Sequence, residues 1–171
     1  MPDFVGSLFE AMGVPMTRRN TGLISIHSVH ATGILAGTKT VEVRRRFPVF
    51  PAGTRLWIYE TAPVGEVTGF VTIKDIERST PAVLWRRHGN FVGISRAAFE
   101  TYLGGCAEAV AICLSGPCRV ITPIAAARLR TMRDRFHPPQ VVTRLNADES
   151  AAIRRLSEGP LTSGVRFGGG Q

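Results

Sequence analysis

The sequence has few cysteines, few lysines and no long hydrophobic run. Its three cysteines, Cys106, Cys113 and Cys118, form no Cys-x-x-Cys pair, so they offer no zinc-binding pattern and indicate free thiols in a reducing compartment. No apolar segment approaches the roughly 20 residues of a membrane-spanning helix. The first residues lack a basic segment followed by an apolar one, so no signal peptide is predicted. We therefore expect a cytoplasmic protein with no membrane contact, no metal and no other cofactor.

Positive charge is abundant, and nearly all of it comes from arginine. The 171 residues include 21 lysines and arginines against 13 acidic residues, which gives a net charge of +8. The only lysines are Lys39 and Lys74. This excess favours a polyanionic partner, nucleic acid before others, although a basic protein without a special partner is the simpler alternative. The hydrophobic fraction of 44% indicates a packed core.

The hydrophobic pattern predicts a small mixed α+β domain. Strands are expected at 22–27, 39–46, 55–61, 65–77 and 107–115, with Gly69 at a bulge or bend of the fourth strand. Helices are expected at 3–12, 29–36, 80–89, 95–105, 122–136 and 146–159, and residues 137–146 are expected to be extended around their prolines. Strands and helices do not alternate regularly, which argues against a doubly wound sheet.

The stretch ILAGTKTVEVRRRFP, residues 34–48, raises the question of a phosphate-binding loop. A Walker A loop needs two glycines separated by four residues, followed directly by Lys-Ser/Thr, between a strand and a helix. Here three residues separate Gly33 from Gly37, and Thr38 intervenes before Lys39. A helix is also predicted to end at Gly37 and a strand to begin at Lys39, so the helix dipole has the wrong direction for a phosphate. These features exclude a phosphate loop.

The same stretch belongs to a longer pattern that resembles the ASCH family of the PUA-like superfamily. The pattern runs in order through LISIHSVHATGILAG, KTVEVRRRFP, LWIYETAPVGEVTG, PAVLWRRHGNFVGISRAAFETYLGG, AVAI and FHPPQ, over roughly residues 22–146. The resemblance implies a PUA-like small β-barrel of about five to six strands with surrounding helices. It divides the chain into an N-terminal helical extension (1–21), the ASCH domain (22–146), and a C-terminal helix with a flexible tail (147–171).

The resemblance also implies a cleft beside the lysine-bearing strand that binds RNA or a nucleoside. Some ASCH proteins resemble enzymes, either amidohydrolases acting on N4-acetylcytidine or ribonucleases. The amidohydrolase branch uses a lysine, a threonine and a later glutamate. Lys39 matches the lysine, but Glu42 falls at the threonine position with Thr40 beside it, and no acidic residue falls near Phe91, where the glutamate is expected.

Candidate ligand-binding residues follow from the predicted strands. Lys39 lies where a helix meets a strand, near the barrel mouth, and Arg45 would share its strand face further along. Glu42 and Arg44 lie on the opposite face, so strand twist or a bulge must bring the two sets into one cleft. An ion pair without a functional role is an equally good interpretation of Glu42 and Arg44.

Three further candidates lie later in the chain. Tyr59 and Thr61 lie near the end of the third strand, and Gln140 follows the Pro-Pro sequence expected at the barrel rim. The leading hypothesis is an RNA- or modified-nucleoside-binding domain that uses these residues with Lys39, Glu42, Arg44 and Arg45. The alternative is a hydrolase of the same family, with Lys39 as base or nucleophile assisted by Glu42 or Thr40. A small-ligand sensor or co-regulator is a third possibility.

Overall fold

The structure, a computed structural model, describes residues 20–133 and 136–158. Six strands form one mixed sheet in the order β2-β5-β4-β3-β1-β6. They are β1 (Thr21–Ile26), β2 (Val41–Arg44), β3 (Arg55–Glu60), β4 (Glu66–Ser79), β5 (Ala109–Ala125) and β6 (Val142–Leu145). The β1–β3 pair is parallel, and the other pairs are antiparallel. No ladder of described residues joins β2 to β6, so the sheet has two edges where a closed barrel would have none.

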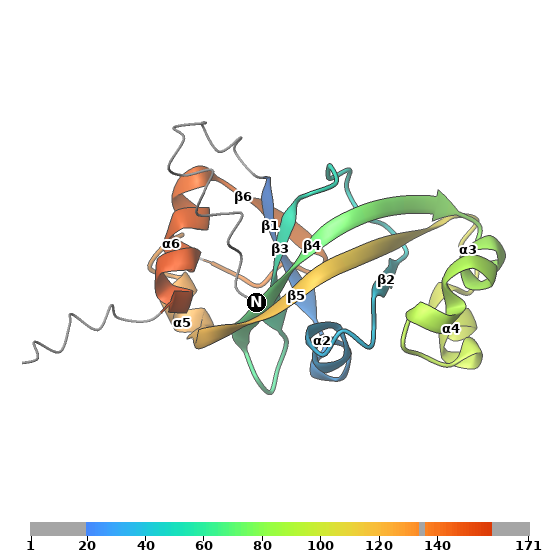
Figure 1. Cartoon of the computed structure of the whole chain (residues 1–171), viewed down its shortest axis with the longest axis horizontal. Helices are drawn as coiled ribbons and strands as arrows, with labels where there is room; N and C mark the ends of the chain where they lie inside the picture. Colours follow the sequence, from blue (N-terminus) through green and yellow to red (C-terminus); the bar gives the residue numbers. More distant parts are fainter. Residues whose placement is uncertain (1–19, 134–135, 159–171) are drawn as a thin grey trace, which may run out of the picture.

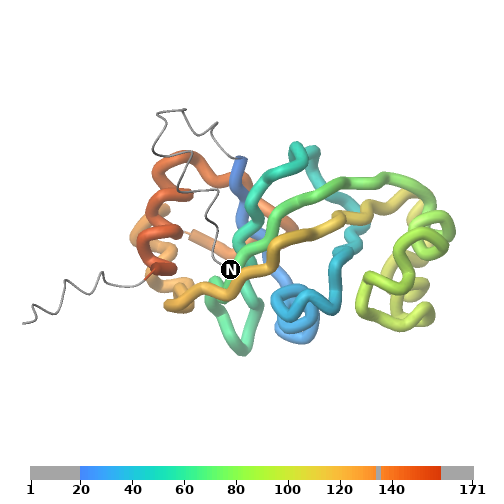
Figure 2. Tube along the Cα trace, in the orientation of Figure 1, coloured from blue at the N-terminus to red at the C-terminus, as the bar shows by residue number. Residues whose placement is uncertain are grey.

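Helices lie at both ends of the sheet and below its middle (Figures 1 and 2). They are α2 (Ser28–Leu35), α3 (Pro81–His88), a 3-10 turn η1 (Gly89–Phe91), α4 (Arg96–Leu103), α5 (Ala126–Leu129) and α6 (Ala147–Glu158). Helices α3 and α4 lie together at one end, and α5 and α6 lie at the other (Figure 1). None of the helices described in the structure is long and apolar enough to cross a membrane.

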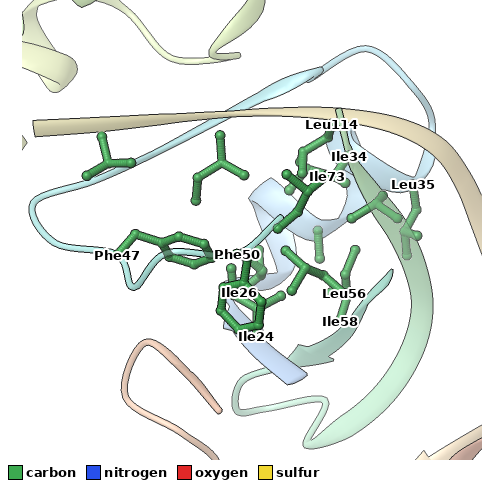
Figure 3. Packing of buried hydrophobic residues seen from close by; sticks show 14 residues of the cluster. Ile24, Ile26, Ile34, Leu35, Phe47, Phe50, Leu56, Ile58, Ile73 and Leu114 are labelled. Carbon is green, nitrogen blue, oxygen red and sulfur yellow. The ribbon is translucent and has the colours of Figure 1, made fainter. Parts of the chain in front are cut away.

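The main hydrophobic core fills the inner side of the curved sheet (Figure 3). Alternate residues of the central strands point into it, among them Ile24, Leu56 and Ile73, and Ile34 of α2 enters from the other side. Two smaller clusters complete the packing, one beneath α5 and α6 and one between β2 and the α3–α4 pair. The α+β class and the barrel-like arrangement predicted from the sequence are therefore confirmed.

The curvature depends on irregularities in the long strands β4 and β5. The pairing of β4 with β5 shifts between Val67 and Gly69, and the pairing with β3 shifts at the same level. A Cβ on Gly69 would lie 2.4 Å from Leu35 Cδ2 and 2.5 Å from the Cys118 carbonyl oxygen. Only glycine lets β4 lie this close to both β5 and α2 at position 69. The bulge predicted at Gly69 is therefore confirmed.

Most predicted elements occur where the pattern placed them, and their caps explain why. Thr80 and Ser95 accept hydrogen bonds from Val83 N and Ala98 N, which fixes the starts of α3 and α4. The helix predicted at 122–136 is wrong over most of its length. Strand β5 continues to Ala125 because it pairs with β4 to its end, and among the described residues of this segment only Ala126–Leu129 is helical.

Two predicted regions lie outside the described residues: the helix at 3–12 and the tail at 159–171. Helix α6, which the sequence assigns to a C-terminal extension, packs into the core of the sheet. Its Ile153 is fully buried in the same cluster as Leu23 of β1 and Trp57 of β3.

Candidate functional site

A cleft of about 590 Å³ opens where β1, α2, β2 and α4 meet. Most of its charged and polar lining comes from the end of β1, from α2 and from residues 39–44, which include β2. Much of its apolar lining comes from α4, from Ile94 just before it and from residues 138–139. The lining residues are Ser25, Ile26, His27, His30, Lys39, Glu42, Val43, Arg44, Thr61, Ile94, Ala98, Tyr102, Pro138, Pro139 and Gln140.

The end of α2 delivers Lys39 to this cleft. Gly37 has φ of 76°, a left-handed conformation that favours glycine, and it ends the helix. The amides of Thr38 and Lys39 then both donate to the Gly33 carbonyl, which turns the chain back toward the sheet. Lys39 therefore lies before the first residue of β2. The alternation of side chains along the strand does not apply to it, so it need not share the face of Val41 as predicted.

Two glycines leave room for the lysine stem. A Cβ on Gly33 would lie 3.3 Å from Lys39 Cβ, and a Cβ on Gly93 would lie 3.1 Å from the same atom. Gly93 also has φ of 65°, so a side chain there would strain the backbone as well. The Lys39 stem is thus held closely between α2 and the loop that precedes α4, and only 4% of the residue is exposed.

Lys39, Glu42 and Arg44 form one buried ion-pair network. Lys39 Nζ lies 3.2 Å from Glu42 Oε2, and Arg44 Nε lies 2.9 Å from Glu42 Oε1. Lys39 Nζ also donates to the Val92 carbonyl, and Arg44 Nη2 donates to the Ser25 carbonyl at 2.8 Å. Two cations share one carboxylate, so the network keeps one net positive charge beside the cleft. Such a charge is costly to bury unless an anion or a polar oxygen approaches it.

His30 of α2 adds a titratable group to the cleft wall. Burial, and then the nearby positive charge of Lys39, lower the pKa of His30 below its usual 6.5, although Glu42 opposes the shift. The ring is therefore neutral at pH 7, and a nitrogen lone pair can accept a proton.

Two further polar groups lie at the same edge of the cleft. His27 Nδ1 lies 3.1 Å from Thr61 Oγ1. The Ser25 hydroxyl is buried and has no hydrogen-bond partner among the described residues.

The structure brings five of the predicted site residues to the cleft and leaves three outside its lining. Lys39, Glu42, Arg44, Thr61 and Gln140 line it. The predicted site residues that do not line it are Thr40, Arg45 and Tyr59, and the contacts of each explain its position.

The backbone of Thr40 joins β5 and the η1 turn: its amide donates to the Phe91 carbonyl, and its carbonyl accepts from Leu114 N. Arg45 is exposed and donates from Nε to the Tyr102 carbonyl at 2.7 Å. Tyr59 is only 5% exposed and packs with Trp57 in the cluster beneath α6. Tyr59 therefore belongs to the core on the other side of β3, because it shares the strand face of Trp57.

Sequence reasoning missed His30, Ala98 and Tyr102 as cleft residues. The sequence predicts the helices that carry two of them: His30 follows the helix start at Ser28, and Ala98 follows the cap at Ser95. Nothing in either helix, however, indicates which face meets the cleft. Within residues 20–133 and 136–158, no group of three or more His, Cys, Asp or Glu residues is placed to hold a metal ion.

Comparisons with known proteins assign this architecture to a family. The family model for the ASCH domain matches residues 24–111. The chain is 34% identical over 139 residues to an "ASCH domain-containing ribonuclease" of Zymomonas mobilis, a match that covers 81% of this chain and 93% of the relative. The chain belongs to the ASCH domain family. The resemblance stated from the sequence motifs is thereby confirmed.

Solved structures agree with this assignment. The crystal structure of ASCH from Zymomonas mobilis superposes with a TM-score of 0.76 at 34% identity, over 80% of this chain and 94% of that one. A protein of Agrobacterium tumefaciens shares the fold at a TM-score of 0.53 and 12% identity, over 82% and 96% of the two chains. In this ASCH domain the family match includes the cleft residues from Ser25 to Tyr102, whereas the segment that carries Gln140 lies beyond it.

Proposed function

We propose that this ASCH domain binds RNA, or a nucleoside unit of RNA, in the cleft beside Lys39. The observation that carries the proposal is the network of Lys39, Glu42 and Arg44, which holds two cations around one carboxylate in the wall of a 590 Å³ cavity. The excess charge attracts an anion, and the cavity is large enough for a base and its sugar.

The remaining hydrogen-bonding capacity of the network favours a phosphate or carbonyl oxygen. A lysine ammonium has three N–H donors. Val92 O and Glu42 use two of those of Lys39, so one is left for a ligand. Arg44 likewise has donors beyond those directed at Ser25 O and Glu42. Fixed donors of this kind bind an oxygen without further ordering of the side chains.

The other walls suit the flat face of a base. Ile26, Ile94 and Ala98 supply apolar surface, and Tyr102 supplies an aromatic ring that is 39% exposed. Single-stranded RNA is recognised mainly by stacking of unpaired bases on such rings together with hydrogen bonds to base edges.

A second candidate function is RNA cleavage, and it is favoured by the relative named a ribonuclease, which this chain matches over 93% of that protein's length. In this hypothesis neutral His30 takes the proton of a ribose 2′-hydroxyl as that oxygen attacks the adjacent phosphorus. The bond from phosphorus to the 5′-oxygen then breaks, which leaves a 2′,3′-cyclic phosphate, and the 5′-oxygen departs as an alcohol with the proton that His30 took up. Lys39 stabilises the negative charge that develops on the phosphoryl oxygens. Lys39 thus acts as an electrostatic group, and Glu42 keeps it in place.

An amidohydrolase acting on an acylated nucleoside is the other enzymatic possibility, and the same cleft would have to serve it. Thr40 does not line the cleft, so this chemistry has only Lys39 and Glu42 of the predicted trio. Incubation with N4-acetylcytidine and with RNA separates the two reactions by their products.

The test compares the only two lysines of the chain. Binding of a fluorescent single-stranded RNA is measured by anisotropy for the wild type, for Lys39→Met and for Lys74→Met, and folding is checked by circular dichroism. Lys74 is exposed and outside the cleft, so its variant removes the same charge as a control. We expect Lys39→Met to bind at least about tenfold more weakly and Lys74→Met to bind within about threefold of wild type. Equal binding by all three proteins would exclude the cleft as the RNA site.

A further inference from the structure

A second, more open groove of about 490 Å³ lies next to the cleft, where β2 ends. It is basic: three arginines line it against one carboxylate, that of Glu108. Its lining residues are Arg45, Arg46, Phe47, Pro48, Arg78, Glu108, Val141 and Val142.

The cleft and this basic groove lie side by side, with neighbouring residues on two walls. On one wall, Tyr102 lines the cleft and Arg45 lines the groove. Arg45 donates to the Tyr102 carbonyl, and its guanidinium carbon lies 5.5 Å from the centre of the Tyr102 ring. On the other wall, Gln140 of the cleft is followed directly by Val141 of the groove. A chain-like ligand can therefore pass from one to the other without leaving the surface.

The arginines of the groove keep donors for a ligand. Arg78 is held by a hydrogen bond from Nη2 to the Phe47 carbonyl, and its other N–H groups make no hydrogen bond or ion pair with the described residues. Arg46 is exposed and makes no hydrogen bond or ion pair with the described residues. Glu108 forms no ion pair with them either, so it neutralises no arginine directly. Exposed guanidinium groups in this state favour phosphate groups, which they bind through two N–H groups at once.

We propose that the basic groove binds the phosphodiester backbone of the nucleotides next to the one held in the cleft. This inference rests on the proposed function and makes it more specific: the ligand is a single-stranded RNA segment, not a free nucleoside. The strand is single because a base reaches a concave pocket only when it has left the stack of a duplex. The Tyr102–Arg45 pair marks the boundary between the base held in the cleft and the backbone in the groove.

Arg46→Glu is the test variant because the side chain has no described contact to lose. The control is Arg155→Glu on α6, which is equally exposed, lies in neither cavity and makes the same charge change. The probe is a labelled RNA of roughly eight nucleotides, a site size ordinary for small single-strand-binding folds. Its 2′-fluoro sugars lack the attacking hydroxyl, so the signal reports binding without cleavage. Anisotropy is measured at several salt concentrations, and unlabelled nucleosides are titrated separately by calorimetry.

We expect Arg46→Glu to weaken RNA binding about tenfold at low salt and to reduce the slope of log K against log salt by about 0.7 or more. Nucleoside binding should stay at the wild-type value, and Arg155→Glu should change RNA binding less than about threefold. If Arg46→Glu and Arg155→Glu show the same RNA affinity and the same salt slope, the groove assignment is overturned. The cleft assignment then still stands. Failure of the wild type to bind RNA would overturn the groove assignment, and failure to bind nucleosides as well would overturn the cleft assignment too. Competition by polyglutamate as strong as that by unlabelled RNA would assign the groove to an acidic polypeptide instead.

Discussion

Two sets of charged residues follow one another on a single short segment, and their surroundings differ sharply. Lys39, Glu42 and Arg44 are largely buried and bonded to one another, with side-chain exposures of 4%, 9% and 14%. Arg45 and Arg46, the next two residues, are exposed. The reason is that β2 ends at Arg44, so the chain leaves the sheet between the two sets. Buried, fixed charges select a ligand by shape and hydrogen bonding, whereas exposed charges add affinity that depends on salt.

The largest effect should come from removing the shared carboxylate. Glu42→Gln keeps the shape of the side chain but leaves two partly buried cations without their counter-charge, so we expect a loss of about 3 kcal/mol in the free energy of unfolding. The matched change in the groove, Glu108→Gln, should stay within about 0.5 kcal/mol because Glu108 is exposed and unpaired among the described residues. Urea denaturation measures both. Similar losses in the two variants would contradict the distinction between cleft and groove.

The glycine beside the lysine stem should have the next largest effect. Gly93→Ala combines backbone strain at a positive φ with a contact of 3.1 Å to Lys39, so we expect a loss of at least about 2 kcal/mol and weaker RNA binding. Gly105 is the control, because its φ is 77° and a Cβ there meets nothing within 4 Å. Gly105→Ala should cost about 1 kcal/mol and leave binding unchanged. If the two variants bind RNA alike, the fit of Lys39 between glycines is unimportant for the site.

Titration of His30 should give a smaller effect that depends on pH. Its pKa is lowered in the folded state, so the unfolded chain takes up the proton first as pH falls through 6.5. The stability that neutral His30 contributes is therefore fully present above about pH 6.5. It decreases as the pH falls below this value, until the ring is protonated in the folded state as well. In His30→Gln, the urea midpoint should change less between pH 7.5 and pH 5.5 than it does in the wild type. In His137→Gln, at an exposed position, it should change as much as in the wild type. A His30→Gln profile parallel to wild type would contradict a perturbed histidine in the cleft.

The smallest effect on stability should come from Arg45. Its side chain is exposed and holds only the Tyr102 carbonyl and the face of the Tyr102 ring, so Arg45→Ala should cost about 0.5 kcal/mol. Arg44→Ala, one residue earlier, should cost about 2 kcal/mol because it leaves Glu42 and the Ser25 carbonyl with fewer partners. Thermal denaturation of the two variants measures the difference between neighbours. A larger loss for Arg45→Ala would reverse the comparison.

Local signals in the sequence were sufficient for most of the fold. The Thr80 and Ser95 caps, the stop at Gly37 and the bulge at Gly69 each reflect a requirement of the backbone, and each is present. The segment at 122–136 was predicted incorrectly because its alanines and arginines favour a helix, while pairing of β5 with β4 decides the structure as far as Ala125. That pairing is a tertiary interaction, which no local pattern contains.

The site was predictable in part, for a related reason. Lys39, Glu42 and Arg44 are close in sequence, so a motif could identify them together. The opposite strand faces expected for them do not arise, because Lys39 precedes β2 and its position is set by the turn after α2, not by the alternation of the strand. Tyr59 was assigned to the ligand because aromatic residues near strand ends often stack on bases, but the cluster beneath α6 occupies that face of β3. The position of α6 depends on long-range packing and could not be read from the strand.

Binding of RNA in the cleft beside Lys39 can be tested directly by an NMR titration. Single-stranded RNA is added to the ¹⁵N-labelled chain, and the amide shifts are followed without any mutation. We expect the largest changes at residues 25–30, 39–46 and 140–142, and also at Ala98 and Tyr102. Changes spread over α6, or confined to the outer faces of α3 and β4, with these segments unmoved, would contradict it.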